Sequence, residues 1–165
     1  MFNNRIGKYQ MTNQEESIAE LLEIRKRKQK QLKNLEKELK KEKISEEIGN
    51  KLRREIKTDI EDIRIRLVSI LEKNCIKIES RINDLKEKNE KLSEGLGAIS
   101  KLMEENEARL KIKQINRIQF HQNRRNYEKE KHTNKKNISE NSMKIQRLSL
   151  LLEKTQGMLT IEKTR

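Results

Sequence analysis

The most constraining feature of this sequence is a line of residues between positions 52 and 110, which we call the seam. Successive members are three or four residues apart throughout: Leu52, Ile56, Ile60, Ile63, Leu67, Ile70, Asn74, Ile78, Ile82, Leu85, Asn89, Leu92, Leu96, Ile99, Met103, Asn106 and Leu110. This spacing places a mainly apolar line on one face of an α-helix, over a length that identifies a coiled coil. The sequence therefore predicts an all-α, elongated coiled coil.

The composition favours helix pairing over a globular core. Of the 165 residues, 41% are charged and 2% are aromatic, and there is no proline. A large core needs aromatic and branched side chains, whereas the absence of proline permits long unbroken helices. Low apolar content can also indicate disorder. Here the few apolar residues recur at helical spacing, which favours paired helices.

Glycines mark two candidate breaks in the helical pattern. The first lies near residues 44–50, where Gly49-Asn50 could form a turn, but Ile44, Ile48 and Leu52 continue at steps of four. Such steps locally unwind a supercoil, so we slightly favour a continuous helix there. The second is Gly95–Gly97, because two glycines weaken a helix interior. A turn at Gly95–Gly97 gives a long antiparallel two-helix hairpin, and a continuous helix gives a rod that must pair with another chain.

The hairpin alternative divides the chain as follows. Residues 1–13 form a loose N-terminus, and Thr12 or Asn13 caps the first helix. Helical arms then span residues 14–94 and 98–160. Residues 161–165 form a frayed tail. Within the second arm, residues 119–137 lose the seam and contain six Lys/Arg and two Glu, before apolar spacing returns at Ile138.

Three asparagines interrupt the apolar seam, at Asn74, Asn89 and Asn106. A buried amide requires a polar partner, so an asparagine in a seam can fix the register of the paired helices. The alternative is a helix rotated far enough to expose these amides to water.

The formal net charge of +13 is unevenly distributed, with +5 on residues 1–55, −1 on 56–110 and +9 on 111–165. Basic ends suit nucleic acid, an anionic membrane or an acidic protein, although they can also be ordinary solvated helix faces. The candidate anion-binding residues are Arg25, Lys26, Arg27, Lys28, Arg124 and Arg125. No nucleic-acid-binding fold signature accompanies them. Stable membrane insertion is not expected, because the apolar stripe does not form the bulky Trp/Phe/Leu face that insertion needs.

No residue pattern predicts catalysis, a cofactor or a metal site. His121 and His132 are eleven residues apart with no cysteine nearby, and Cys75 beside the seam suits packing better than nucleophilic chemistry. We therefore do not expect an enzyme. The first residues lack the apolar stretch of a signal peptide, which favours a cytoplasmic protein.

Residues Ile18–Lys43 read IAELLEIRKRKQKQLKNLEKELKKEK. This segment resembles the start of the FliJ/YscO-type proteins of type III secretion, which open with a short apolar group followed by a charged helix. The resemblance implies a helical hairpin that serves as a central stalk in an export ATPase ring and assists cargo delivery. No functional residues are carried over from it.

The sequence as a whole predicts a non-catalytic scaffold or adaptor that binds protein partners by packing helix against helix. The stalk of a type III secretion ATPase complex is its sharper form. The alternatives are a basic coiled-coil protein that binds nucleic acid and a homo-oligomeric structural coiled coil.

Overall fold

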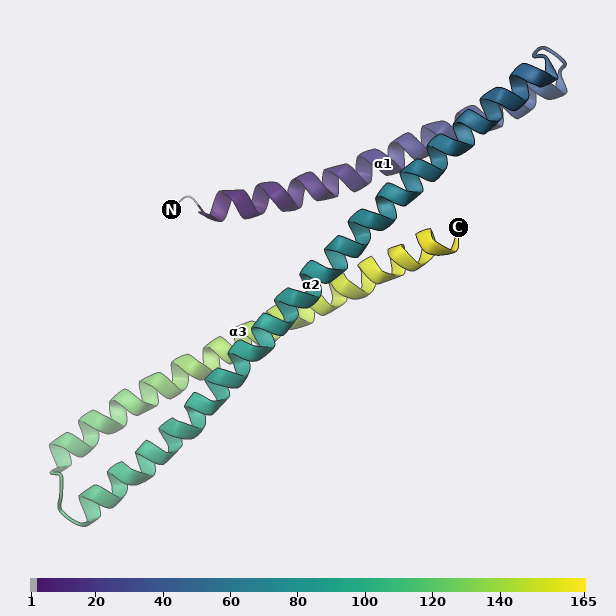
Figure 1. Ribbon diagram of the computed structural model, residues 1–165. Coiled ribbons are helices and arrows are strands. Elements are labelled where there is room, and N and C mark those ends of the chain that lie inside the picture. Colours follow the sequence, from purple (N-terminus) through teal and green to yellow (C-terminus); the bar gives the residue numbers. More distant parts are fainter. Residues whose placement is uncertain (1–2) are drawn as a thin grey trace. The chain divides into compact units, whose positions relative to one another are not determined.

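The chain forms three α-helices in the part that the computed structural model describes, which is residues 3–165, with side chains from Ile18 onward. Helix α1 spans Asn3–Lys40, α2 spans Glu46–Lys111 and α3 spans Arg117–Thr164 (Figure 1). Over these residues there is no β-strand. The prediction of an all-α fold is confirmed, with three helices where the hairpin alternative had two.

The helices pack into two compact units. The three-helix unit contains the described residues up to Cys75 together with Thr155–Arg165, and the hairpin unit contains Ile76–Lys154. Helices α2 and α3 contribute to both units. At 66 residues, α2 is about 100 Å long at the α-helical rise per residue.

The hairpin unit is an antiparallel pair of helices. Asn106 is hydrogen-bonded to Asn123, and Asn89 is hydrogen-bonded to Ser142. The residue numbers of the two pairs add to 229 and 231, and a nearly constant sum indicates that the two helices run antiparallel. The buried apolar side chains on α2 in this unit are Ile78, Ile82 and Ile99. They belong to the predicted seam, so the second half of the seam packs within one chain, against α3.

The three-helix unit contains the best-buried side chains among the described residues. Its α1 and α2 run antiparallel, with Lys28 paired to Asp59 and Arg53 paired to Glu36. The last turns of α3 also contact α2, through Lys163 and Glu72. Leu67 and Leu71 are the largest fully buried side chains. Because two helices cover α2 here, its buried face extends beyond the seam residue Leu67 to include Leu71.

The first turn lies at residues 41–45, so the favoured continuous helix through residues 40–51 is wrong. Glu42 adopts a left-handed conformation with φ 58°. The Lys43 N–H donates to the Glu38 carbonyl and the Glu42 N–H to the Leu39 carbonyl, which is a Schellman helix end. Ser45 then caps α2, since its hydroxyl accepts a hydrogen bond from the Ile48 N–H. Gly49 lies inside α2, where it makes room for the Leu39 side chain.

The second turn lies at residues 112–116, and the candidate turn at Gly95–Gly97 is wrong because α2 continues through it. Lys113 takes the left-handed position with φ 59°. The Gln114 N–H donates to the Arg109 carbonyl and the Lys113 N–H to the Leu110 carbonyl, which is again a Schellman end. Both turns therefore use a charged residue at the position where glycine is usual.

Both chain ends also differ from the prediction. Helix α1 begins at Asn3, so within residues 3–13 the expected loose segment is helical, and Met1 and Phe2 lie outside the described residues. At the other end, α3 continues to Thr164 and Glu162 is buried. The segment expected to fray at 161–165 is therefore helical as far as Thr164, and one of its side chains, Glu162, is enclosed by the other helices.

Residues 119–137 continue the seam spacing in α3 with three polar and two aromatic side chains, which corrects the expectation that the seam is lost there. Phe120, Asn123, Tyr127, Lys131 and Asn134 are half-buried at steps of three or four. The polar residues Asn123, Lys131 and Asn134 hide the pattern from a reading of aliphatic residues alone. Asn134 faces Gly95 of α2, where an added Cβ would come 3.1 Å from its amide nitrogen.

Replacing Gly97 with alanine should stabilise the protein by about 0.5 to 1 kcal/mol, because alanine is the better residue inside a helix. A Cβ at Gly97 would meet no atom within 4 Å, so no steric cost opposes the gain. Urea denaturation followed by circular dichroism measures the change. Gly95→Ala is the matched control and should gain less, since its Cβ crowds Asn134. A turn at this position would instead make Gly97→Ala destabilising.

Candidate functional site

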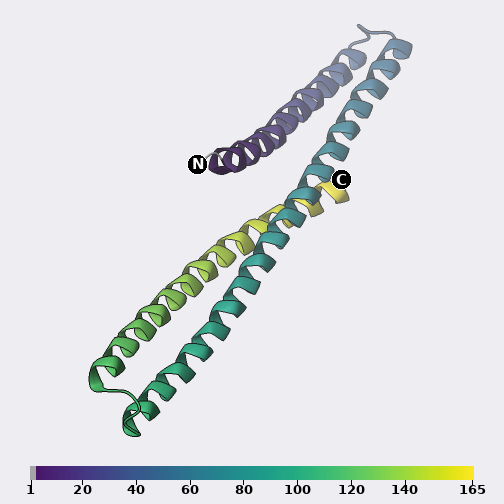
Figure 2. The same cartoon turned by 60° about the vertical axis from the view of Figure 1, so that its left-hand side comes forward.

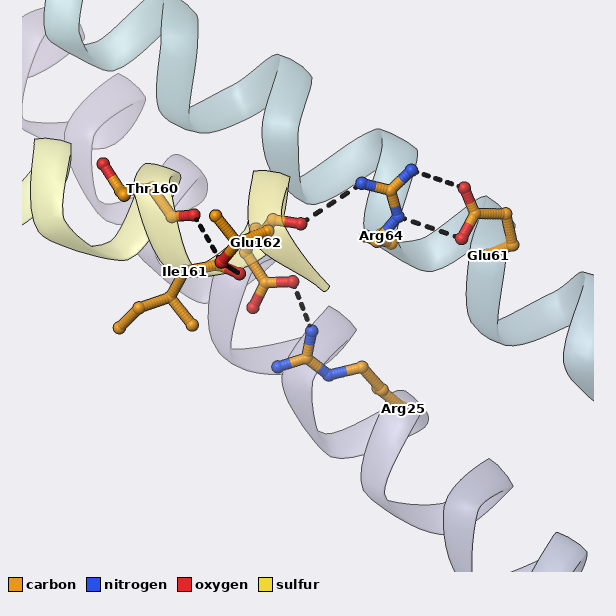
Figure 3. A network of polar contacts seen from close by, with 7 residues as sticks. Arg25, Glu61, Arg64, Thr160, Ile161 and Glu162 are labelled. Atoms are coloured by element: carbon orange, nitrogen blue, oxygen red, sulfur yellow. Dashed lines mark hydrogen bonds and ion pairs between the residues drawn. The ribbon is translucent and has the colours of Figure 1, made fainter.

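A buried ion pair joins α1 to α3 in the three-helix unit. The Arg25 Nη1 atom donates to Glu162 Oε2 at 2.6 Å, and the two side chains are 10% and 8% exposed (Figure 3). Arg25 continues a line of inward positions on α1 that includes Leu22 and Leu32. Two charges therefore occupy places where a coiled coil usually has apolar side chains.

Arg64 of α2 extends this network to the third helix. Its Nη1 atom donates to the main-chain carbonyl oxygen of Glu162 at 3.2 Å, while Nε and Nη2 donate to Glu61 at 2.9 and 2.5 Å (Figure 3). These hydrogen bonds lower the pKa of the Glu61 carboxyl and raise the pKa of Arg64. Arg25, Arg64 and Glu162 thus connect α1, α2 and α3 in one polar layer.

This polar layer can select the register in which α1 packs against the end of α3. Leaving one buried charge without its partner is costly, so only the arrangement that joins Arg25 to Glu162 satisfies both. Apolar contacts along a seam are less selective, because a shift by one heptad brings apolar residues together again. The network therefore favours one register of α1 against the end of α3.

A second polar layer lies in the hairpin unit beside the turn. Asn106 is buried, its Nδ2 donates to the Phe120 carbonyl oxygen at 3.1 Å, and its Oδ1 accepts from Asn123 Nδ2 at 3.0 Å. Asn116 begins α3 with a reciprocal cap, because its Oδ1 accepts from the Gln119 N–H at 2.8 Å and its N–H donates to Gln119 Oε1 at 3.2 Å. These bonds fix how α3 starts relative to the end of α2.

Asn106→Ala should lower the free energy of unfolding by about 1 to 3 kcal/mol, because it removes two hydrogen bonds and strands their partners in a half-buried layer. Urea denaturation of the full chain measures the loss. Asn83→Ala removes an exposed amide from the same helix and should change stability by less than about 0.5 kcal/mol. Equal effects of the two substitutions would contradict a stabilising role for the Asn106 layer.

The other two seam asparagines are less enclosed. Asn89 is half-buried and its Nδ2 donates to Ser142 Oγ at 3.3 Å, while Asn74 is half-buried in the three-helix unit. Register control by these residues stays a prediction.

The seam itself differs from the prediction near its start. Leu52 is exposed, although it was assigned to the seam. Further along, Leu71 and Cys75 are buried, whereas their neighbours Ile70 and Asn74 are only half-buried. A second packed helix explains the shift, since α3 covers a face of α2 that a two-helix seam would leave open.

The structure separates the candidate anion-binding residues. Arg25 is committed to Glu162, and Lys28 pairs with Asp59 at 2.7 Å. Arg124 pairs with Glu128 on the surface of α3. The remaining three candidates, Lys26, Arg27 and Arg125, are exposed and make no ion pair with the described side chains.

In the hairpin unit, α3 carries apolar side chains that are partly exposed to solvent. Met143 and Leu150 are seven residues apart, so they lie on one face of the helix, and each is more than half exposed. Leu151 beside them is also exposed. A spacing of seven residues is the repeat by which a helix presents knobs to a partner helix.

Other chemistry has little support in the described part of the chain. Phe120 and His121 form an edge-to-face ring pair with centroids 5.2 Å apart, and His121 is exposed. No cluster of three or more His, Cys, Asp or Glu side chains suited to a metal ion occurs from Ile18 onward. Among the described helices, none combines the length and apolarity needed to cross a bilayer.

Comparison of this chain with protein-family models, with curated proteins and with solved structures finds no match.

Proposed function

We propose that this chain is a non-catalytic coiled-coil adaptor that binds a protein partner by helix–helix packing. The observation that carries the proposal is the apolar outer face of α3, where Met143 and Leu150 are exposed at a seven-residue spacing. Packing within the two units already buries the seam residues Leu67, Ile82 and Ile99. A partner helix laid along α3 would bury Met143 and Leu150, which packing within this chain leaves exposed.

The sharper form of this proposal is a stalk in the export ATPase complex of a type III secretion system, acting in the cytoplasm. Its support is the resemblance of Ile18–Lys43 to FliJ/YscO-type proteins, together with two antiparallel helix pairs that share α2.

The test is capture of a purified type III export ATPase by the full chain. Wild type should retain the ATPase, and Met143→Glu/Leu150→Glu should weaken retention by at least about tenfold, because charges replace the apolar contact. Gln146→Glu/Ser149→Glu adds the same charge at exposed positions between them and should bind as wild type. Failure of wild type to bind contradicts the stalk. Equal binding by both double variants contradicts the use of this face of α3.

The same face could instead pair with a second copy of the chain. Sedimentation equilibrium separates this outcome, because a homo-oligomer shows a mass that rises with concentration. The Met143→Glu/Leu150→Glu variant should then sediment as a monomer.

Nucleic-acid binding is the second candidate function. The net charge of +13 favours it, as do the exposed Lys26, Arg27 and Arg125, which form no ion pair with any side chain from Ile18 onward. Binding through these side chains releases counterions, so the affinity should fall steeply as salt rises. An electrophoretic shift of duplex or single-stranded probes at low salt is the measurement, and the absence of any shift rules this candidate out.

A further inference from the structure

The turn between α2 and α3 combines exposed apolar side chains with unbalanced positive charge. Residues 111–118 read KIKQINRI, and we call them the tip; they close one end of the hairpin unit (Figures 1 and 2). Ile112 is 71% exposed and Ile118 is 69% exposed, the two highest values among the large apolar side chains described.

The conformation of the tip prevents these isoleucines from folding inward. Lys113 is locked in the left-handed region by the Schellman bonds at the end of α2. Asn116 and Gln119 lock the start of α3 by their reciprocal cap. Ile115 between them is half-buried and anchors the turn. The hydrogen-bonded turn and the first turn of α3 thus leave Ile112 and Ile118 exposed.

The charge around the tip has one sign. Residues 109–125 contain six Lys/Arg and no Asp or Glu. Arg109 pairs with Glu105 and Arg124 with Glu128, so neighbouring turns supply two counter-charges. Lys111, Lys113 and Arg117, which all lie in the tip, make no ion pair with the described side chains. Glu104 and Glu107 lie in the preceding turns of α2. Their negative charges reduce the positive potential around the tip but do not cancel it.

We propose that the tip is a contact site for an anionic lipid bilayer surface. Lysine and arginine beside a bilayer are attracted to anionic headgroups, and exposed isoleucines can enter the boundary between headgroups and acyl chains. A nucleic acid would satisfy the cations and leave both isoleucines in water. The contact is peripheral, and it involves a different surface from the α3 face assigned to a protein partner.

A single tryptophan reports the contact, because the chain contains none. Ile112→Trp in the full chain should show a blue shift of its emission on mixing with phosphatidylcholine vesicles that contain phosphatidylserine, and no shift with phosphatidylcholine alone. Ile76→Trp places the reporter at another exposed position of α2, near the opposite end of the hairpin unit, and should show no shift with either vesicle. Equal shifts at both positions, or with both lipids, would overturn the proposal.

Charge and apolar variants test the two components separately by vesicle sedimentation. Lys111→Gln/Lys113→Gln/Arg117→Gln should weaken binding to the anionic vesicles by at least about tenfold. Lys26→Gln/Arg27→Gln/Lys30→Gln removes the same charge from exposed positions of α1 and should weaken binding much less. Ile112→Ser/Ile118→Ser should also reduce binding.

Three results overturn the proposal: no sedimentation of wild type with anionic vesicles, unchanged binding by the tip variants, or a tip that binds a nucleic acid or an acidic polypeptide but not the vesicles. The Met143→Glu/Leu150→Glu variant should still bind vesicles. Failure of the protein-adaptor proposal and failure of the lipid proposal are therefore distinguishable.

Discussion

Arg25→Met should lower the free energy of unfolding by about 3 kcal/mol, because it leaves the Glu162 carboxylate buried without its partner. The 2.6 Å contact and the low exposure of both side chains place this pair among the buried class of ion pairs. Urea denaturation followed by far-ultraviolet circular dichroism measures the loss. Lys28→Met is the matched control on the same helix, and it removes a more exposed pair with Asp59 worth less than about 1 kcal/mol.

The double variant Arg25→Met/Glu162→Met distinguishes a buried charge from a general packing defect. With both charges removed, apolar side chains fill the layer, and stability should return to within about 1 kcal/mol of wild type or exceed it. A double variant as unstable as the sum of the two single variants would show that the two charges do not interact across α1 and α3.

Leu67→Ala should cost about 2 to 5 kcal/mol, because Leu67 is 1% exposed where three helices meet and its removal leaves a cavity. Ile65→Ala on the same helix is the control, since Ile65 is 55% exposed and its truncation should cost less than about 0.5 kcal/mol. Thermal and urea denaturation of the two variants give the comparison. Similar losses would mean that α1 and α3 do not enclose this part of α2.

The two turns show why the helix ends predicted from the sequence were wrong. Glycine is the usual residue in a left-handed position, so Gly95–Gly97 looked like a turn. The chain instead places Glu42 and Lys113 at the left-handed positions and keeps Gly95 and Gly97 inside α2. The hydrogen bonds of the Schellman ends offset the strain that a side chain incurs in this conformation.

Local signals for the true turns are nevertheless present in the sequence. Ser45 is followed by two glutamates, which is typical of a helix start, and Asn116 with Gln119 has the spacing of a capping box. The apolar lines at Ile44, Ile48 and Leu52 concealed the first of these signals, because they suggested an unbroken helix. At these two turns the caps were more informative than the glycines, whereas the cap expected at Thr12 or Asn13 was wrong, because both residues lie inside α1.

The buried charges could not be found from the sequence. Arg25 is part of a basic run, so it was grouped with Lys26, Arg27 and Lys28 as a candidate anion-binding residue. Its partner Glu162 is 137 residues away, in the segment expected to fray. Nothing local to either residue distinguishes a buried charge from a solvated one.

The sequence by itself determined the helical state of α2 and the periodic line of mainly apolar residues from Ile56 to Leu110, because side-chain periodicity is a local property of the helix. Only the tertiary structure decided where α2 begins and ends, which helix covers each part of it, and that Leu71, Cys75, Arg25 and Glu162 lie inside. Those outcomes depend on contacts between residues far apart in the chain, and the spacing of a seam does not reveal which helix lies opposite it.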